Sequence, residues 1–171
     1  CEHYSTILAP ADVETLTDTV NVRRGSYGKR TVSFVDYSQI DAGLSPASKS
    51  VGALSVLDYL DGWTGLSNSE YRAKKSRVTE ILLRRLTEQF PGIADAVEHA
   101  ELATPKTIRR YTGNPGGTAY GFAQSPDQSL LARRIESPLS NLRFASAWTF
   151  PGGGFTGAIV SGYRAANAVL S

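Results

Sequence analysis

The residues most informative about the architecture are 142–170, which read LRFASAWTFPGGGFTGAIVSGYRAANAVL. The apolar run over 142–148 predicts a short strand. Pro151 and the three glycines after it end that strand. Apolar and small residues then predict a helix over 155–170. This order of strand, glycine loop and helix indicates a backbone turn placed directly before the N-terminus of a helix.

The glycines of this loop have a known spacing. Gly152, Gly154 and Gly157 match G-x-G-x-x-G, a pattern that lets backbone amides approach a phosphate or another anionic group. Glycine inside a helix costs about 1 kcal/mol relative to alanine, so Gly157 and Gly162 indicate a steric requirement. A complete Rossmann fingerprint also needs an acidic residue about 20 positions later, and the chain ends at Ser171. On these residues alone, a helix entry used only for packing stays an open alternative.

A second glycine-rich stretch covers residues 103–122 and reads ATPKTIRRYTGNPGGTAYGF. Thr104 and Pro105 form a helix start signal, with threonine as the N-cap and proline at the first helical position. Four glycines follow among three aromatic residues, namely Tyr111, Tyr120 and Phe122. Such residues suit a wall against a flat conjugated ring, and the same residues equally allow a loop that is merely pinned by its aromatic side chains.

The N-terminal part of the chain predicts a small sheet and one long helix. Residues 31–37 and 51–57 are apolar or β-branched and are expected to form strands of an antiparallel pair or a small sheet. A helix is expected from Ser69, as its N-cap, to the stop at Pro91, with apolar residues on one face and a solvated charged face. Residues 97–102 are expected to form a further strand.

Composition limits the classes of function. The chain has 171 residues and a net charge of +2, which is too balanced to indicate nucleic acid or an anionic membrane as a partner. One cysteine and two separated histidines provide neither a disulfide framework nor a metal-ligand cluster, and no serine stands in a G-x-S-x-G elbow. No apolar run approaches the roughly 20 residues of a membrane span. Because the chain starts at Cys1 rather than methionine, we expect a processed or excised piece of a longer protein.

Two blocks of sequence together resemble the C-terminal part of the phytoene desaturase and carotenoid isomerase-like flavoproteins, which are related more distantly to the flavin amine oxidases. The first block is 103–122, and the second and more specific block is 144–167. The close similarity covers roughly residues 97–170. Residues 1–96 fit loosely and resemble the substrate-domain sheet of the family with its inserted helix.

The resemblance implies a fold class and a domain organisation. We expect an α+β fragment of a two-domain α/β flavoprotein, in which a substrate-domain sheet with helices precedes the C-terminal strand, glycine loop and helix of the FAD-binding domain. Residues 1–140 would be mainly the substrate-binding portion, and 141–171 would return to the FAD-binding domain. The N-terminal Rossmann part of the same polypeptide, absent from these residues, would be the main protein partner and would hold the ADP half of FAD.

The resemblance also implies which residues surround the flavin. The helix N-terminus, with its partial positive charge and free amides, would stabilise the anionic reduced flavin. Gly116, Gly117 and Tyr120 would lie nearer the flavin face and the substrate channel. No metal ligand and no catalytic acid or base is assigned. The expected contacts of the isoalloxazine and ribityl parts are Trp148, Thr149, Pro151, Gly152, Gly153, Gly154, Phe155, Thr156 and Gly157.

Two departures from the family pattern matter. The opening G-x-G-x-x-G with its following acidic residue is not among these residues, so the chain is not expected to build the whole FAD site or to be active alone. Related flavoproteins often have an acidic residue just before the final loop, where this chain has Ser146 and Ala147. Any phosphate contacts are therefore expected to come mainly from backbone amides.

The function implied for the longer protein is FAD-dependent desaturation, isomerisation or saturation of C–C bonds by hydride transfer to or from the flavin. The substrate would be a hydrophobic molecule, a polyene of the carotenoid or retinoid kind. Two alternatives stay open, an enzyme like the flavin amine oxidases that acts on a C–N bond, and a non-catalytic binding domain that retains the fold. The cytoplasm is the expected location, and peripheral membrane association would fit a polyene substrate.

Overall fold

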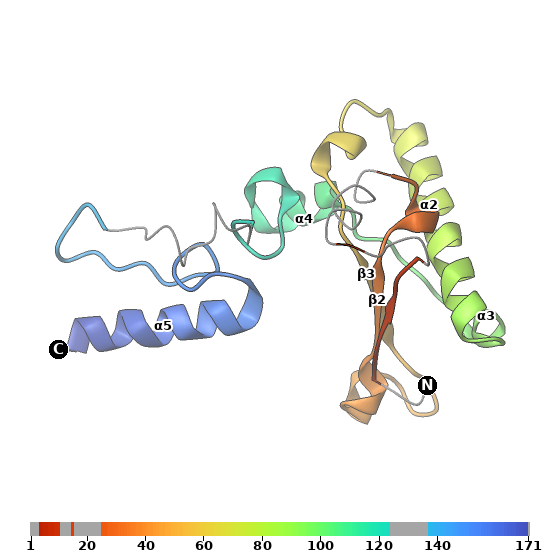
Figure 1. Cartoon of the computed structure of the whole chain (residues 1–171), viewed down its shortest axis with the longest axis horizontal. Coiled ribbons are helices and arrows are strands. Elements are labelled where there is room, and N and C mark those ends of the chain that lie inside the picture. Colours follow the sequence, from red (N-terminus) through yellow and green to blue (C-terminus); the bar gives the residue numbers. More distant parts are fainter. Residues whose placement is uncertain (1–3, 11–14, 16–24, 124–136, 171) are drawn as a thin grey trace. The chain divides into compact units, whose positions relative to one another are not determined.

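The computed structural model describes residues 4–10, 15, 25–123 and 137–170 (Figure 1). The chain forms two compact units, the sheet unit, Cys1–Thr104, and the loop unit, Pro105–Ser171. The sheet unit contains a three-stranded sheet and a long helix, and the loop unit contains helices joined by glycine-rich turns. This mixture agrees with the expected α+β class. The two-domain architecture of a longer protein, and its boundary near residue 140, stay predictions.

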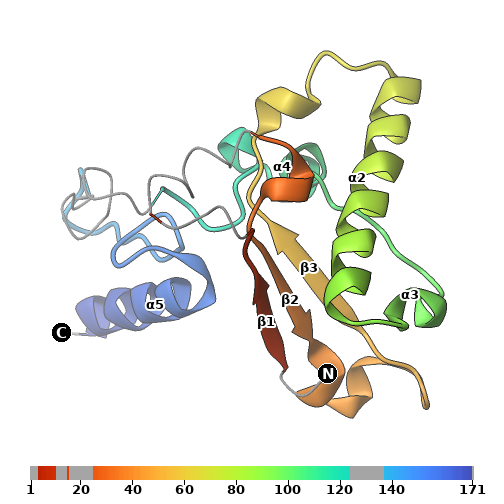
Figure 2. The ribbon, with the colours of Figure 1, turned by 45° about the vertical axis from the view of Figure 1, so that its right-hand side comes forward.

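The sheet is antiparallel throughout, with the strand order β1-β2-β3, and Figure 2 shows the three strands side by side. Both predicted strands and their antiparallel pairing are confirmed. The register places Leu8, Val32 and Val56 in one row across the sheet. Because side chains alternate between the faces of a strand, this row shares one face. The strands are β1 (Ser5–Leu8), β2 (Val32–Asp36) and β3 (Gly52–Val56).

The long helix α2 (Asn68–Gln89) has Ser67 as its N-cap, so the prediction of Ser69 was wrong. The Ser67 hydroxyl accepts a hydrogen bond from the Glu70 amide at 3.3 Å, and the Glu70 carboxylate accepts one from the Ser67 amide at 2.8 Å. This reciprocal capping box requires a spacing of three residues, and only Ser67 stands three residues before Glu70. The helix ends at Gln89 with Phe90 as its C-cap, and Gly92 turns the chain with a φ of 87°, which confirms the predicted stop.

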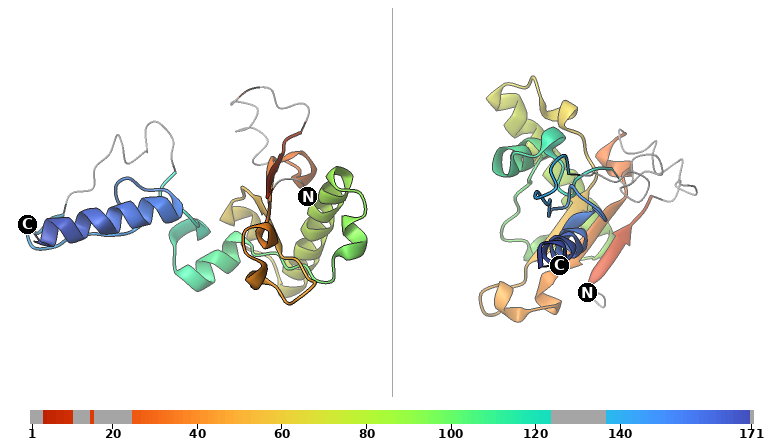
Figure 3. Two further views of the ribbon diagram at one scale, coloured as in Figure 1. Left: turned by 90° about the horizontal axis from the view of Figure 1, so that it is seen from below. Right: turned by 90° about the vertical axis from the view of Figure 1, so that its left-hand side faces the viewer.

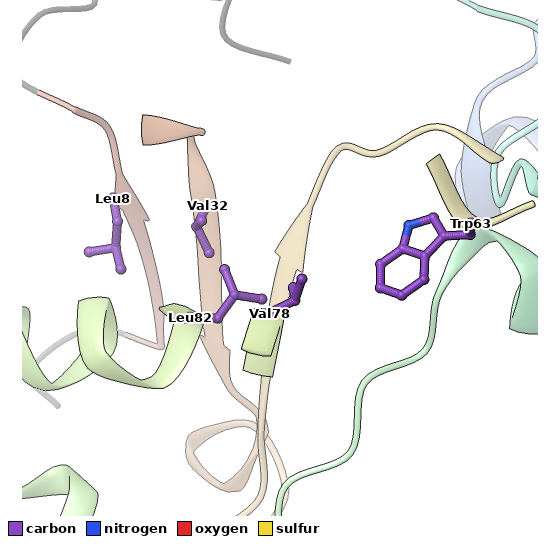
Figure 4. Packing of buried hydrophobic residues seen from close by; sticks show 5 residues of the cluster. All are labelled: Leu8, Val32, Trp63, Val78 and Leu82. Carbon is purple, nitrogen blue, oxygen red and sulfur yellow. The ribbon is translucent and has the colours of Figure 1, made fainter. Parts of the chain in front are cut away.

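The core of the sheet unit lies between the sheet and α2. Val78, Leu82 and Leu86 are buried along α2 at steps of four residues, as the apolar periodicity predicts. Figure 4 shows the buried cluster, to which the sheet contributes two side chains, the helix two, and the turn after β3 an indole. Its members are Leu8, Val32, Trp63, Val78 and Leu82.

Two predicted strands do not form. Residues 97–102 and 142–148 have no regular secondary structure beyond turns and bends. Glu98 forms an ion pair with Lys49 instead, and Glu101 lies 3.6 Å from the Lys75 ammonium. An apolar or β-branched run becomes a strand only where a neighbouring strand presents free backbone groups, and the described sheet places no partner beside either segment.

The loop unit begins with a helix at Pro105, which confirms the predicted helix start. The second predicted helix also forms, and Figure 3 shows it as one continuous helix that reaches the C-terminal end of the described chain. The elements of the loop unit are α4 (Pro105–Thr112), η5 (Pro115–Gly117) and α5 (Gly154–Leu170). The short helices of the sheet unit are η1 (Tyr27–Lys29), η2 (Tyr37–Gln39), η3 (Ala42–Leu44), η4 (Leu60–Trp63) and α3 (Ile93–Ala96).

Candidate functional site

The turn before α5 is built from three consecutive glycines in the left-handed region. Gly152, Gly153 and Gly154 have φ values of 76°, 77° and 64°. Residues with a Cβ rarely adopt this conformation. Successive amides in such a turn form a concave surface that binds anions, and the first amides of a helix have no acceptor within the helix. The three glycines of the turn therefore carry no side chains of their own, and the Tyr120 ring lies beside Gly154.

Close backbone approach requires glycine at Gly157, and at Gly154 a side chain would be tight against a ring and strained by a φ of 64°. A Cβ added at Gly157 would lie 1.9 Å from the carbonyl oxygen of Gly152, and one added at Gly154 would lie 3.0 Å from the ring of Tyr120. The predicted steric requirement at Gly157 is therefore confirmed. Gly162 differs, because within the described residues nothing lies within 4 Å of an added Cβ.

Hydroxyl groups hold the loop against α5. Ser161, 3% exposed, accepts a hydrogen bond from the Ser146 amide at 3.2 Å and shares a short hydrogen bond with the Thr149 hydroxyl. The Thr149 hydroxyl also donates to the Ser146 carbonyl at 3.0 Å. Thr149, predicted as a flavin contact, is therefore engaged in this network. No sequence motif predicted the role of Ser161; the signal was a serine among the small residues of the predicted helix.

The second glycine-rich stretch also relies on close backbone approach. A Cβ added at Gly117 would lie 2.1 Å from the carbonyl oxygen of Pro105. One added at Gly121 would lie 2.3 Å from the carbonyl oxygen of Ala147, in the segment before the final loop. Gly116 has a φ of 64°, and a Cβ added there would meet no atom of the described residues within 4 Å. The structure therefore brings the two glycine-rich segments into direct backbone contact.

The aromatic residues of these segments divide into two groups. The Phe122 and Trp148 rings meet edge to face, with centroids 4.9 Å apart and planes at 85°, and Tyr120 lies against Gly154. Tyr111 is exposed beside the Arg110 guanidinium, 5.6 Å from its ring centre. The structure thus assembles Tyr120, Phe122 and Trp148 at the final loop, whereas Tyr111 is not shown to join them.

The remaining predicted contacts surround the same turn. Pro151 is half-buried before it, while Phe155 and Thr156 are exposed on the first turn of α5, Phe155 at 85%. The Arg164 guanidinium lies 4.6 Å from the centre of the Phe150 ring. These positions place the predicted cofactor-binding residues around one helix N-terminus; their contact with a flavin stays a prediction.

A partly buried polar cluster in the sheet unit was not predicted from the sequence. Asp58 accepts hydrogen bonds from the Tyr27 phenol at 2.7 Å, the Trp63 indole at 2.7 Å and the Arg30 guanidinium at 2.8 Å. The Arg85 guanidinium donates to the backbone carbonyls of Leu8, Tyr27 and Arg30. No motif joins residues this far apart in sequence, so the sequence carried no signal for the cluster.

The electrostatics of this cluster follow from its hydrogen bonds. Burial, followed by the hydrogen bond to Asp58, raises the pKa of the Tyr27 phenol well above its ordinary value. Burial also acts to raise the pKa of Asp58, but hydrogen bonds from Tyr27, Arg30 and Trp63 outweigh it and hold that pKa below its ordinary value. The cluster borders an open hollow of about 920 Å³. Since the Asp58 carboxylate accepts hydrogen bonds from Tyr27, Arg30 and Trp63, the cluster supports the fold.

Two kinds of feature are not found in the described part of the chain. No helix there is long and apolar enough to cross a membrane. Within the same residues, no group of three or more His, Cys, Asp or Glu side chains is arranged to hold a metal ion.

Comparison with known proteins places the chain among flavoproteins. A family model described as flavin containing amine oxidoreductase matches residues 22–170. The chloroplastic prolycopene isomerase 2 of an Oncidium hybrid cultivar is 30% identical over 134 residues, which are 77% of this chain and 23% of that protein. The all-trans-retinol 13,14-reductase of Danio rerio is 24% identical over 111 residues, 61% of this chain and 18% of that protein.

The chain thus spans less than a quarter of the length of these curated relatives. No solved structure matches it. The family match and the isomerase similarity confirm the resemblance predicted from the two glycine-rich blocks.

Proposed function

This chain belongs to the flavin-containing amine oxidoreductase family, and from this premise we propose that it supplies the C-terminal part of an FAD-dependent oxidoreductase. In this proposal the final glycine turn and α5 close on the flavin, and an N-terminal Rossmann part of the same polypeptide holds the rest of the cofactor. The chain alone is inactive because it carries only one side of that site.

The observation that carries the proposal is the turn at Gly152–Gly154. Gly152 and Gly153, both left-handed, precede α5, a helix of 17 residues whose first residue is the left-handed Gly154, so the turn lies at the positive end of the helix dipole. The three glycines of the turn have no side chains of their own, and Tyr120 stands beside Gly154. These features fit the polar edge of a flavin.

The residues proposed to hold the cofactor act mainly through their backbone. The amides of the glycine turn and of the first turn of α5 would bind the pyrimidine edge of the flavin and stabilise negative charge there. Ser146 and Thr149 would keep that turn in place through their hydrogen bonds to Ser161. When bound, FAD supplies hydride transfer, whereas the chain orients it and excludes water.

We propose a hydrophobic polyene as the substrate, with the reaction at C–C bonds. The support is that the relatives include proteins named prolycopene isomerase and all-trans-retinol 13,14-reductase. The description of the family model as amine oxidoreductase favours a second candidate, oxidation of a C–N bond. The cytoplasmic location and a peripheral membrane contact stay predictions, and the names of the isomerase relatives include the word chloroplastic.

The test is the visible absorbance spectrum of the full-length protein, purified without added cofactor. We expect a flavin spectrum that dithionite bleaches, and release of FAD on denaturation. A colourless, folded protein that cannot be reconstituted with FAD would overturn the proposal in favour of a non-catalytic binding domain. Anaerobic bleaching by primary or secondary amines, with no reaction of polyenes, would instead establish the C–N candidate.

A further inference from the structure

The two glycine-rich segments of the loop unit are joined through Asn114, a residue that no motif singled out. Its side-chain oxygen accepts a hydrogen bond from the Trp148 indole N–H at 3.3 Å, and its side-chain nitrogen donates to the carbonyl of Thr118 at 3.0 Å. Its backbone amide donates to the Thr112 hydroxyl at 3.1 Å. Because both ends of the amide group are engaged, the side chain is held in one orientation.

Asn114 in turn fixes the indole of Trp148. The edge-to-face contact with Phe122 holds the ring, the bond to Asn114 holds its N–H, and the Trp148 backbone amide donates to the Ser146 hydroxyl at 3.1 Å. Trp148 stands four residues before Gly152, where the left-handed turn begins. The indole and the backbone amide of Trp148 are therefore both held by contacts close to the start of the turn in sequence.

Two further contacts involve the same glycine-rich segments. Gly121 approaches the Ala147 carbonyl so closely that no Cβ would fit, and the Thr118 hydroxyl donates to the Gly121 carbonyl at 3.0 Å. Asn114 and Gly121 thus lie at the two ends of a loop that contacts Ala147 and Trp148, in the segment before the glycine turn. Asn114 is therefore connected to the glycine turn by its hydrogen bond to Trp148 and by the short stretch of chain from Trp148 to Gly152.

We propose that Asn114 is a positioning residue for the flavin site, acting through Trp148 on the amides of the final glycine turn. The inference rests on the proposed function and extends it, because it assigns Trp148 to holding the loop rather than to stacking on the flavin ring. Asn114 itself does not touch the cofactor in this arrangement. It sets how closely the turn amides approach the edge of the flavin that becomes negative on reduction.

The test compares Asn114→Ala and Trp148→Phe in the full-length protein, with Asn141→Ala as the matched control at an exposed position. Phenylalanine keeps an aromatic ring beside Phe122 but removes the N–H donor. We expect each variant to raise the dissociation constant for FAD about tenfold, the effect of one lost hydrogen bond. The flavin midpoint potential should fall in both, because displaced amides stabilise the reduced form less. The double variant should be no worse than either single one, since both changes break the same bond.

The outcomes separate the inference from its premise. A wild-type protein that binds no flavin overturns the proposed function itself. A flavin-bound wild type with an unchanged dissociation constant and potential in both variants overturns only the role of Asn114. Weaker FAD binding with an unchanged potential also overturns it, because that result shows a merely structural contact. If Asn114→Ala does not fold, Trp148→Phe decides by the same criteria.

Discussion

The contacts that stabilise the interior of the sheet unit differ in kind from those that stabilise the interior of the loop unit. Every buried hydrophobic side chain among the described residues lies in the sheet unit, between the sheet and α2. The buried residues described in the loop unit are only three glycines and a serine, namely Gly117, Gly121, Gly157 and Ser161. The sheet unit is therefore stabilised mainly by packed side chains, and the loop unit mainly by close contacts between backbone segments.

This difference separates two ways of responding to mutation. A core of side chains loses free energy in proportion to the volume removed, whereas a backbone contact has no room for even one added methyl group. The loop unit also leaves the apolar side chains of α5 exposed, including Phe155, Ile159 and Tyr163. Such a face on a helix is typical of a surface that another part of a protein covers, which agrees with the proposed Rossmann partner.

The largest effect is expected at the glycine turn. Gly154→Val in the full-length protein should abolish flavin retention, because the new side chain would be strained at a φ of 64° and would collide with the Tyr120 ring. Gly65→Val is the matched control, since Gly65 lies in the sheet unit, has a φ of 71° and would place a Cβ more than 4 Å from any atom in the described part of the chain. The measurement is the flavin content of the purified proteins. An unchanged content in Gly154→Val would refute the placement of the loop.

A large but graded effect is expected in the side-chain core. Leu82→Ala should lower the free energy of unfolding of the sheet unit by about 3 kcal/mol, because Leu82 is buried in a packed cluster. Leu57→Ala, at 60% exposure, should change it by less than about 0.5 kcal/mol. Urea unfolding followed by Trp63 fluorescence in a Trp148→Phe background reports the sheet unit alone, since the chain has two tryptophans. Equal effects of the two substitutions would contradict the described core.

A smaller loss of stability is expected at the partly buried polar cluster around Asp58. Asp58→Asn keeps the size and one acceptor oxygen but removes the charge that faces Arg30, and should cost about 2 kcal/mol of unfolding free energy at neutral pH. Asp61→Asn is the matched control, because Asp61 lies on the exposed turn nearby.

The same pair of proteins tests the charge of Asp58. Because the pKa of Asp58 is lowered in the folded state, its contribution is present above the unfolded value of about 3.9 and is lost as pH falls through the folded pKa. The stability difference between wild type and Asp58→Asn should therefore shrink on acidification below about pH 4. A difference that stays constant from pH 7 to pH 3 would show that the carboxylate charge has no role.

The smallest effect is expected at the hydroxyl network of the loop unit. Ser161→Ala removes the acceptor of the Ser146 amide and a partner of Thr149, and should cost about 1 kcal/mol. Ser76→Ala, on the exposed face of α2, should stay within about 0.5 kcal/mol. Thermal unfolding of the full-length proteins measures both. A destabilisation by Ser76→Ala as large as that by Ser161→Ala would mean that the hydrogen bonds of Ser161 contribute no measurable stability.

Periodicity predicted the elements whose stabilisation is local or whose partner is adjacent in sequence. The hairpin of β2 and β3 and the helices α2 and α5 formed where apolar spacing and stop signals placed them. The N-cap of α2 was misassigned by two residues because Ser67 and Ser69 have the same chemistry. Only the spacing to Glu70 distinguishes them, and a capping box depends on that spacing.

The strands predicted over 97–102 and 142–148 failed for a different reason. Their composition favours extended backbone, but a strand is stabilised by hydrogen bonds to a neighbour, and the chain carries no local record of whether one is beside it. The glycine turn could be predicted from the sequence. Its φ values lie near 70°, and at Gly157 an added Cβ would overlap backbone atoms, so the conformation of the turn favours glycine and the glycines indicate it.

Local chemistry thus specified the helices, the hairpin and the glycine turn, since each depends on residues close together in the chain. Tertiary packing alone brought Asp58 to Tyr27, Arg30 and Trp63, and Asn114 to Trp148. The polar groups of those residues can bond to many partners, and they become specific only when folding removes water and leaves one partner within reach. A hydrogen bond between distant residues depends on the positions of all the elements between them, so no local pattern in the sequence encodes it.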